Sequence, residues 1–122
     1  MKKDDLKKYF KSESEQMGKY RIESIHAQLE LEEAEKKHDP NLTIYEKAVK
    51  NAEQEEDVFS EVYAKKIFDY LKDFAPVLIR KRNDQKVNWE EAFGSDYLTL
   101  SKGLKASLIA LVEDDGGQYR LE

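Results

Sequence analysis

Pro40 separates two long stretches of sequence in which apolar residues recur with helical spacing. On both sides the steps are three and four residues, which places the side chains on one face of an α-helix. The upstream set is Leu6, Phe10, Met17, Tyr20, Ala27, Leu31 and Ala34, widened by Ile22, Ile25 and Leu29. The downstream set is Tyr45, Ala48, Val49, Ala52, Phe59, Val62, Tyr63, Ile67, Tyr70, Leu71 and Phe74. Because proline disfavours helix in the residue before it, Asp39-Pro40 predicts a turn between two antiparallel helices.

We therefore predict an all-α fold: a long antiparallel helical hairpin, completed by a short helix and a C-terminal helix in a small bundle. The 122 residues are expected to form a single helical domain. The predicted helices span residues 5–37, 43–75, 89–93 and 96–113, followed by a short tail at 114–122.

Several residues predict where these helices begin. Thr43 and Glu46 have the spacing of a capping box, and Asn88 precedes two acidic residues that suit a first turn. Ser95 or Asp96 would begin the last helix. A short strand at 97–100, with the helix starting at 101, remains an alternative.

The weakest part of the first predicted helix lies between Lys11 and Gly18, where Ser12, Ser14 and Gly18 lower the helix propensity. An unbroken helix over residues 5–37 would be roughly 50 Å long, more than a compact domain of this size spans. The helix either breaks between Ser12 and Gly18, which we favour, or the molecule is elongated and self-associates.

Pro76 predicts the end or a kink of the second helix, and residues 77–79 could add one or two turns beyond it. The polar segment that follows, Arg80 to Lys86, is predicted to be a loop.

The composition excludes several classes of function. There are no cysteines, which removes thiol catalysis, disulfides and thiolate metal sites. No apolar run approaches the roughly 20 residues of a membrane span, and no signal peptide is evident at the start. We expect a soluble, cytoplasmic protein that does not enter a membrane.

Acidic residues are concentrated on both sides of the predicted turn, in a chain of net charge −5. This acidic band, at Glu30 to Glu35 and Glu53 to Asp57, would suit a partner protein with a basic surface, which it would attract at long range. The leading hypothesis is a small non-enzymatic protein that binds another protein, as an inhibitor, immunity factor or adaptor. Its predicted contacts are Glu32, Glu33, Glu55, Glu56 and Asp57.

The pairs Glu30-x-x-Glu33 and Glu53-x-x-Glu56 would lie at similar heights in such a hairpin, where four carboxylates could hold Mg²⁺. This arrangement resembles the MazG-type nucleotide pyrophosphohydrolases, whose motif is Glu-x-x-Glu, a spacer, then Glu-x-x-Asp. The resemblance implies an alternative function as a Mg²⁺-dependent nucleotide hydrolase. The last position here is Glu56 rather than Asp.

Three further interpretations remain. The basic segment Arg80 to Lys86, with Trp89 nearby, could contact phosphates, but the net negative charge argues against direct nucleic-acid binding. A structural homo-oligomer would cover the long stripe with a second copy. Aromatic residues suited to an interface are Tyr63, Tyr70, Trp89 and Tyr97.

Overall fold

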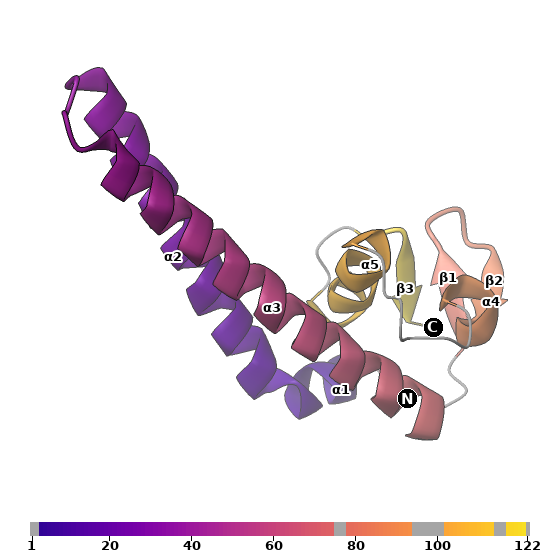
Figure 1. The fold of residues 1–122 in the computed structure, drawn as a ribbon. Helices are drawn as coiled ribbons and strands as arrows, with labels where there is room; N and C mark the ends of the chain where they lie inside the picture. The colour runs from indigo at the N-terminus through magenta and orange to yellow at the C-terminus, as the bar shows by residue number, and fades with distance from the viewer. Residues whose placement is uncertain (1–2, 75–77, 94–101, 114–116, 122) are drawn as a thin grey trace. The chain divides into compact units, whose positions relative to one another are not determined.

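The computed structural model describes residues 3–74, 78–93, 102–113 and 117–121. The chain divides into two compact units, Glu15–Phe59 and Met1–Ser14 with Ser60–Glu122. We call the first the hairpin unit and the second the sheet unit. The predicted fold class is confirmed: the molecule is mainly helical, with two long helices and a short C-terminal helix (Figure 1).

The long helices are α2 (Lys11–Lys36) and α3 (Leu42–Phe74), which run antiparallel on either side of the turn (Figure 1). The predicted turn at Asp39-Pro40 is confirmed. The backbone amides of His38 and Asp39 donate to the carbonyls of Glu35 (3.2 Å) and Ala34 (3.0 Å). His38 has a φ of 53°. This pair of bonds and the left-handed residue form a Schellman motif, a common way to end a helix.

The two helices meet along a seam whose residues recur at alternating steps of three and four, as in a coiled coil. The seam residues are buried or half-buried: Met17, Tyr20, Ser24, Ala27, Leu31 and Ala34 on α2, and Tyr45, Val49, Ala52, Glu56 and Phe59 on α3. Two contacts set the register. The Tyr20 and Phe59 rings lie 5.2 Å apart, and Ser24 Oγ donates to Glu56 Oε2 at 2.7 Å.

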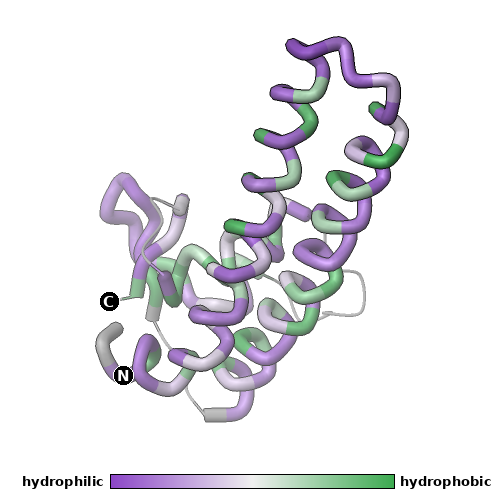
Figure 2. Tube along the Cα trace, turned by 90° about the vertical axis from the view of Figure 1, so that its left-hand side faces the viewer, coloured by the Kyte–Doolittle hydropathy of each residue, from purple (hydrophilic) through white to green (hydrophobic). Residues whose placement is uncertain are grey.

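One part of the predicted stripe is wrong. Ile22, Ile25 and Leu29 were expected to widen the buried face, but their side chains are 57%, 57% and 58% exposed. In the seven-residue repeat of the seam they occupy positions on the opposite side of α2. Figure 2 shows apolar positions interleaved with polar ones along both arms of the hairpin. Ala48 and Val62 of α3, also expected in the stripe, are exposed as well.

The first predicted helix does break, but not where we favoured. Helix α1 (Lys3–Tyr9) ends before a turn at Phe10, and α2 continues without interruption through Gly18. The bend follows burial rather than weak propensity, because Phe10 is buried with its ring 6.1 Å from that of Tyr63.

A small antiparallel sheet begins where further helical turns were considered: Leu78 and Ile79 are in a strand, and Val77 lies outside the described residues. The loop predicted at Arg80 to Lys86 is confirmed for residues 82–85, which form the turn between two strands, and is wrong at its ends, which are in the strands. The strands are β1 (Leu78–Lys81), β2 (Lys86–Asn88) and β3 (Tyr119–Leu121), in the order β2-β1-β3. The predicted tail therefore contains a paired strand.

The register of the sheet separates its two faces. Ile79 is opposite both Val87 and Leu121, and all three side chains are buried. Because directly opposed residues of an antiparallel pair share a face, these three form the apolar row that faces the core.

Two further helices complete the sheet unit. Helix α4 (Trp89–Phe93) has its predicted bounds, and Asn88 caps it, since Asn88 Oδ1 accepts from the Glu91 amide at 2.8 Å. Helix α5 (Lys102–Glu113) ends where predicted. The predicted starts at Ser95, Asp96 or Ser101 and the alternative strand at 97–100 lie outside the described residues. The core of this unit includes Leu6, Phe10, Tyr63, Ile67, Phe68, Leu71, Ile79, Leu108, Leu111 and Val112.

Candidate functional site

The predicted partner-binding carboxylates lie on both arms of the hairpin unit. Glu32, Glu33, Glu55 and Asp57 are exposed, and Glu56 is half-buried. Glu56 belongs to the seam, where it accepts the Ser24 hydroxyl, so its carboxylate holds the helices together rather than facing outward. The other four side chains lie on the surface of α2 and α3.

Glu33 is engaged within its own helix. Its Oε1 lies 2.8 Å from Lys37 Nζ, one turn further along, and both side chains are well exposed. The hydrogen bond from Lys37, followed by the attraction of its charge, lowers the pKa of Glu33, and the same bond raises the pKa of Lys37. Lys37 therefore partly neutralises this end of the acidic band.

The four glutamates of the predicted Mg²⁺ site are not brought together. Among the described residues, no three acidic or histidine side chains lie close enough to hold a metal ion. Helix geometry explains this, because Glu56 points into the seam whereas Glu33 lies on the outside of α2, paired with Lys37. Glu30 and Glu53 are exposed on the flanks of the seam.

The aromatic residues predicted for an interface lie mostly in the core. Tyr63 and Trp89 are buried, and the Trp89 ring packs edge-on against Phe68 with centroids 5.2 Å apart. Tyr70 is half-buried against Tyr9, at 4.2 Å. Tyr97 lies outside the described residues. Tyr9, which the sequence analysis did not select, is 60% exposed.

The basic segment belongs to the sheet unit, and a residue from the C-terminal strand joins it. Arg80 is opposite Lys86 on one side and Arg120 on the other, so the three share the face of the sheet away from the apolar row. We call them the basic row. Arg120 was missed by the sequence analysis, because the alternation Tyr119-Arg120-Leu121 is too short to predict a strand.

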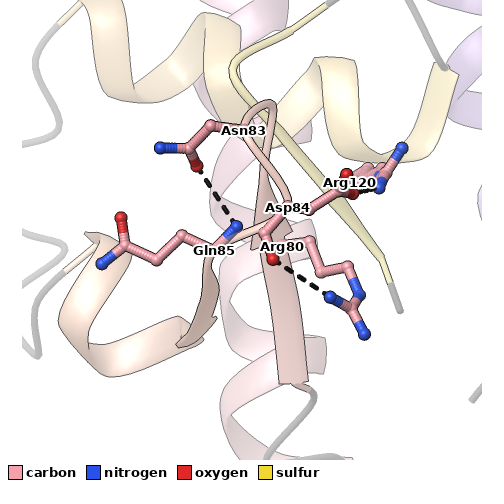
Figure 3. Close-up of polar contacts among 5 residues, drawn as sticks. All are labelled: Arg80, Asn83, Asp84, Gln85 and Arg120. Atoms are coloured by element: carbon pink, nitrogen blue, oxygen red, sulfur yellow. Dashed lines mark hydrogen bonds and ion pairs between the residues drawn. The ribbon is translucent and has the colours of Figure 1, made fainter.

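Asp84 brings a negative charge against this row (Figure 3). Its carbonyl oxygen accepts from Arg80 Nη1 at 3.0 Å, and its carboxylate forms an ion pair with Arg120. Two hydrogen bonds stabilise the turn between β1 and β2. The Asp84 amide donates to the Lys81 carbonyl at 2.9 Å, and Asn83 Oδ1 accepts from the Gln85 amide at 3.2 Å. The sheet thus partly neutralises its own cations.

The fold contains no helix, within the part of the chain that the structure describes, that is long and apolar enough to cross a membrane. Comparison with protein-family models, with curated proteins and with solved structures found no match to this chain. Its function must therefore be inferred from the two units themselves.

Proposed function

We propose that this protein is a non-enzymatic module that binds a partner protein with a basic surface, through the exposed carboxylates of its hairpin unit. The partner class includes enzymes or adaptors that present clustered lysine and arginine side chains. An inhibitor, immunity factor or adaptor would work in this way.

The observation that carries the proposal is the division of charge between the units. Residues 15–59 contain 12 Asp and Glu against 6 Lys and Arg, a net charge of −6. The rest of the chain contains 14 acidic and 15 basic residues, a net charge of +1. The whole negative excess of the molecule is thus confined to one helical hairpin.

The exposure of the carboxylates supports the same conclusion. Glu30, Glu32, Glu53, Glu55 and Asp57 all lie on the surface of the hairpin unit. Exposed charge of one sign raises the rate at which an oppositely charged partner associates, and this effect weakens as salt screens it.

The test is capture of partners from the native host by the immobilised protein, at low and at high salt, with each captured protein then purified and its affinity measured. The hairpin variant Glu53→Lys/Glu55→Lys changes the net charge by four units. The matched control, Glu61→Lys/Glu90→Lys, makes the same change in the sheet unit at two exposed positions.

We expect a basic partner whose affinity falls by about tenfold or more with the hairpin variant and by less than about twofold with the control. Raising the salt concentration should reduce the binding of the native protein toward that of the variant. Equal loss in both variants, or a partner that binds independently of salt, would contradict the proposal.

A further inference from the structure

The side of α2 that faces away from α3 carries a short apolar stripe, formed by Ile22, Ile25 and Leu29. We call it the outer stripe. Its three side chains follow one another at steps of three and four residues, and each is more than half exposed. On the described part of α3 the exposed large apolar residues are Ile44, Val58 and Val62, of which Val58 and Val62 are one helical step apart, so they form a pair rather than a run of three. A contiguous exposed stripe is typical of a surface that meets another helix.

The charges around the outer stripe are arranged symmetrically but with opposite sign. Lys19 lies three residues before Ile22, and Glu32 lies three residues after Leu29. About one helical turn further from the stripe, Glu15 lies seven residues before Ile22, and Lys36 lies seven residues after Leu29. Three- and seven-residue steps keep a side chain near the same face of a helix, so all four flank the stripe.

This pattern is complementary to itself in one orientation. When two copies of α2 are placed antiparallel about a twofold axis beside Ile25, Ile22 of each copy is opposite Leu29 of the other. Lys19 then lies opposite Glu32, and Glu15 opposite Lys36, twice each by symmetry. A parallel arrangement would instead place each of these charges beside its own equivalent, which costs free energy.

We propose that the outer stripe is a homodimer interface, in which α2 of a second copy of this chain packs antiparallel along it. The occupant is a second copy because the stripe and its flanking charges match their own reversed sequence. The contact is isologous, as in most dimers with a twofold axis.

The small size of the interface indicates a weak, reversible contact. The segment from Glu15 to Lys36 rises roughly 32 Å along the helix at 1.5 Å per residue. One helix contact of this length, centred on six apolar side chains, falls below the area of a typical stable interface. We therefore expect a reversible dimer with a dissociation constant on the order of micromolar, strengthened at low salt.

The first test is sedimentation velocity of the full chain over a range of concentrations from micromolar to millimolar. Ile25→Glu puts a charge at the centre of the proposed interface and should weaken the dimer by at least about 30-fold. Val58→Glu is the matched control, since Val58 is 58% exposed on α3 and lies outside the outer stripe. It should leave the dissociation constant within about twofold.

The second test uses the flanking charges. Lys19→Glu and Glu32→Lys should each weaken self-association by about tenfold, because each change turns two attractions into repulsions. Mixing the two single variants should restore a dimer. In the mixed dimer, the glutamate introduced at position 19 of one copy lies opposite the lysine introduced at position 32 of the other, and the second pair keeps its native residues. The double variant Lys19→Glu/Glu32→Lys should restore the dimer as well.

A chain that stays monomeric at millimolar concentration would overturn the proposal. So would variants at Ile25 and Val58 that weaken association equally, or a mixture of charge variants that gains nothing over its components. The Glu53→Lys/Glu55→Lys variant should leave the dimer intact, so loss of the basic partner and loss of self-association are separate results.

Discussion

His38 has a backbone conformation that residues other than glycine and asparagine seldom adopt. Its φ of 53° places it in the left-handed region, at the position where a Schellman motif most often has glycine. The side chain is exposed and contributes no burial that would offset the strain. Glycine would therefore fit this position of the turn better than histidine does.

Replacing His38 with glycine should raise stability. Removing the steric cost of the left-handed conformation should increase the free energy of unfolding by about 1 kcal/mol. The matched control is His26→Gly, which puts glycine in the interior of α2 and should lower it by about 1 kcal/mol. Chemical denaturation of both variants measures the difference, and the same sign in both would contradict the assignment.

Gly117 is required by close packing in the sheet unit. A Cβ added there would lie 2.6 Å from Ala110 Cβ, closer than two carbon atoms can approach without a shift. Gly117→Ala should therefore cost about 1–3 kcal/mol, as overpacking does elsewhere. At Gly103 an added Cβ meets nothing within 4 Å, so Gly103→Ala should cost nothing. Thermal unfolding distinguishes the two.

The pair Glu33–Lys37 predicts a pH effect on one carboxylate. The hydrogen bond from Lys37 lowers the pKa of Glu33 in the folded state, so the stabilisation is present above the unfolded pKa and is lost as pH falls through the folded pKa. In the Lys37→Gln variant, carbon-13 NMR should show Glu33 titrating at a higher pH than in the native protein. An unchanged midpoint would show that the pair does not persist in solution.

At the scale of whole elements, periodicity predicted the hairpin but not the assignment of its faces. Ile22 and Ile25 are three residues apart, which is a helical step, and each lies one or two residues from a seam position, so the sequence analysis assigned them to one wide stripe. The seven-residue repeat assigns these two residues to the outer face of α2 only when the alignment of α2 with α3, shown by the contact between Ser24 and Glu56, is known. Because that register depends on contacts across the hairpin, a single helix's pattern could not supply it.

The sheet was missed for a related reason. Strands β1, β2 and β3 are three or four residues long, too short for alternation to be distinguished from chance. Leu121 pairs with Ile79 across a long separation in sequence, and no local signal encodes such a pairing. The charged surfaces were predicted in part. The acidic band follows from the sequence, whereas the basic row can be recognised only when the pairing of the strands is known.

The small residues of the seam give an element-scale prediction. Ala34 is buried where α2 approaches α3, so Ala34→Leu should force the helices apart at a cost of about 1–3 kcal/mol. Ala48→Leu adds the same atoms at an exposed position of α3 and should change stability by less than about 0.5 kcal/mol. Equal effects on the urea midpoint would argue against this seam.

On the scale of the molecule, the two units have cores of different composition. The buried positions of the hairpin unit are Met17, Ala27, Ala34 and Val49. The sheet unit buries large side chains, among them Phe10, Tyr63, Phe68 and Trp89. Burial of apolar area sets local stability, so the hairpin unit should open more readily.

Hydrogen exchange tests this difference. Amides within residues 27–52 should exchange faster than those within 63–71 and 108–112, although all of them lie in helices or the turn between them. Measured by mass spectrometry on peptides, the protection factors should separate by about tenfold or more. Uniform protection would mean that the chain unfolds as one cooperative unit.

The alternating spacing of the seam also limits how the hairpin can change length. An insertion of one residue between Ala27 and Leu31 would rotate the part of α2 before the insertion by about 100° relative to the part after it. The seam and the outer stripe would then each be interrupted. Insertions or deletions of seven residues, matched in both arms, would preserve both surfaces. Descendants of this chain should therefore lengthen or shorten their hairpins in whole heptads.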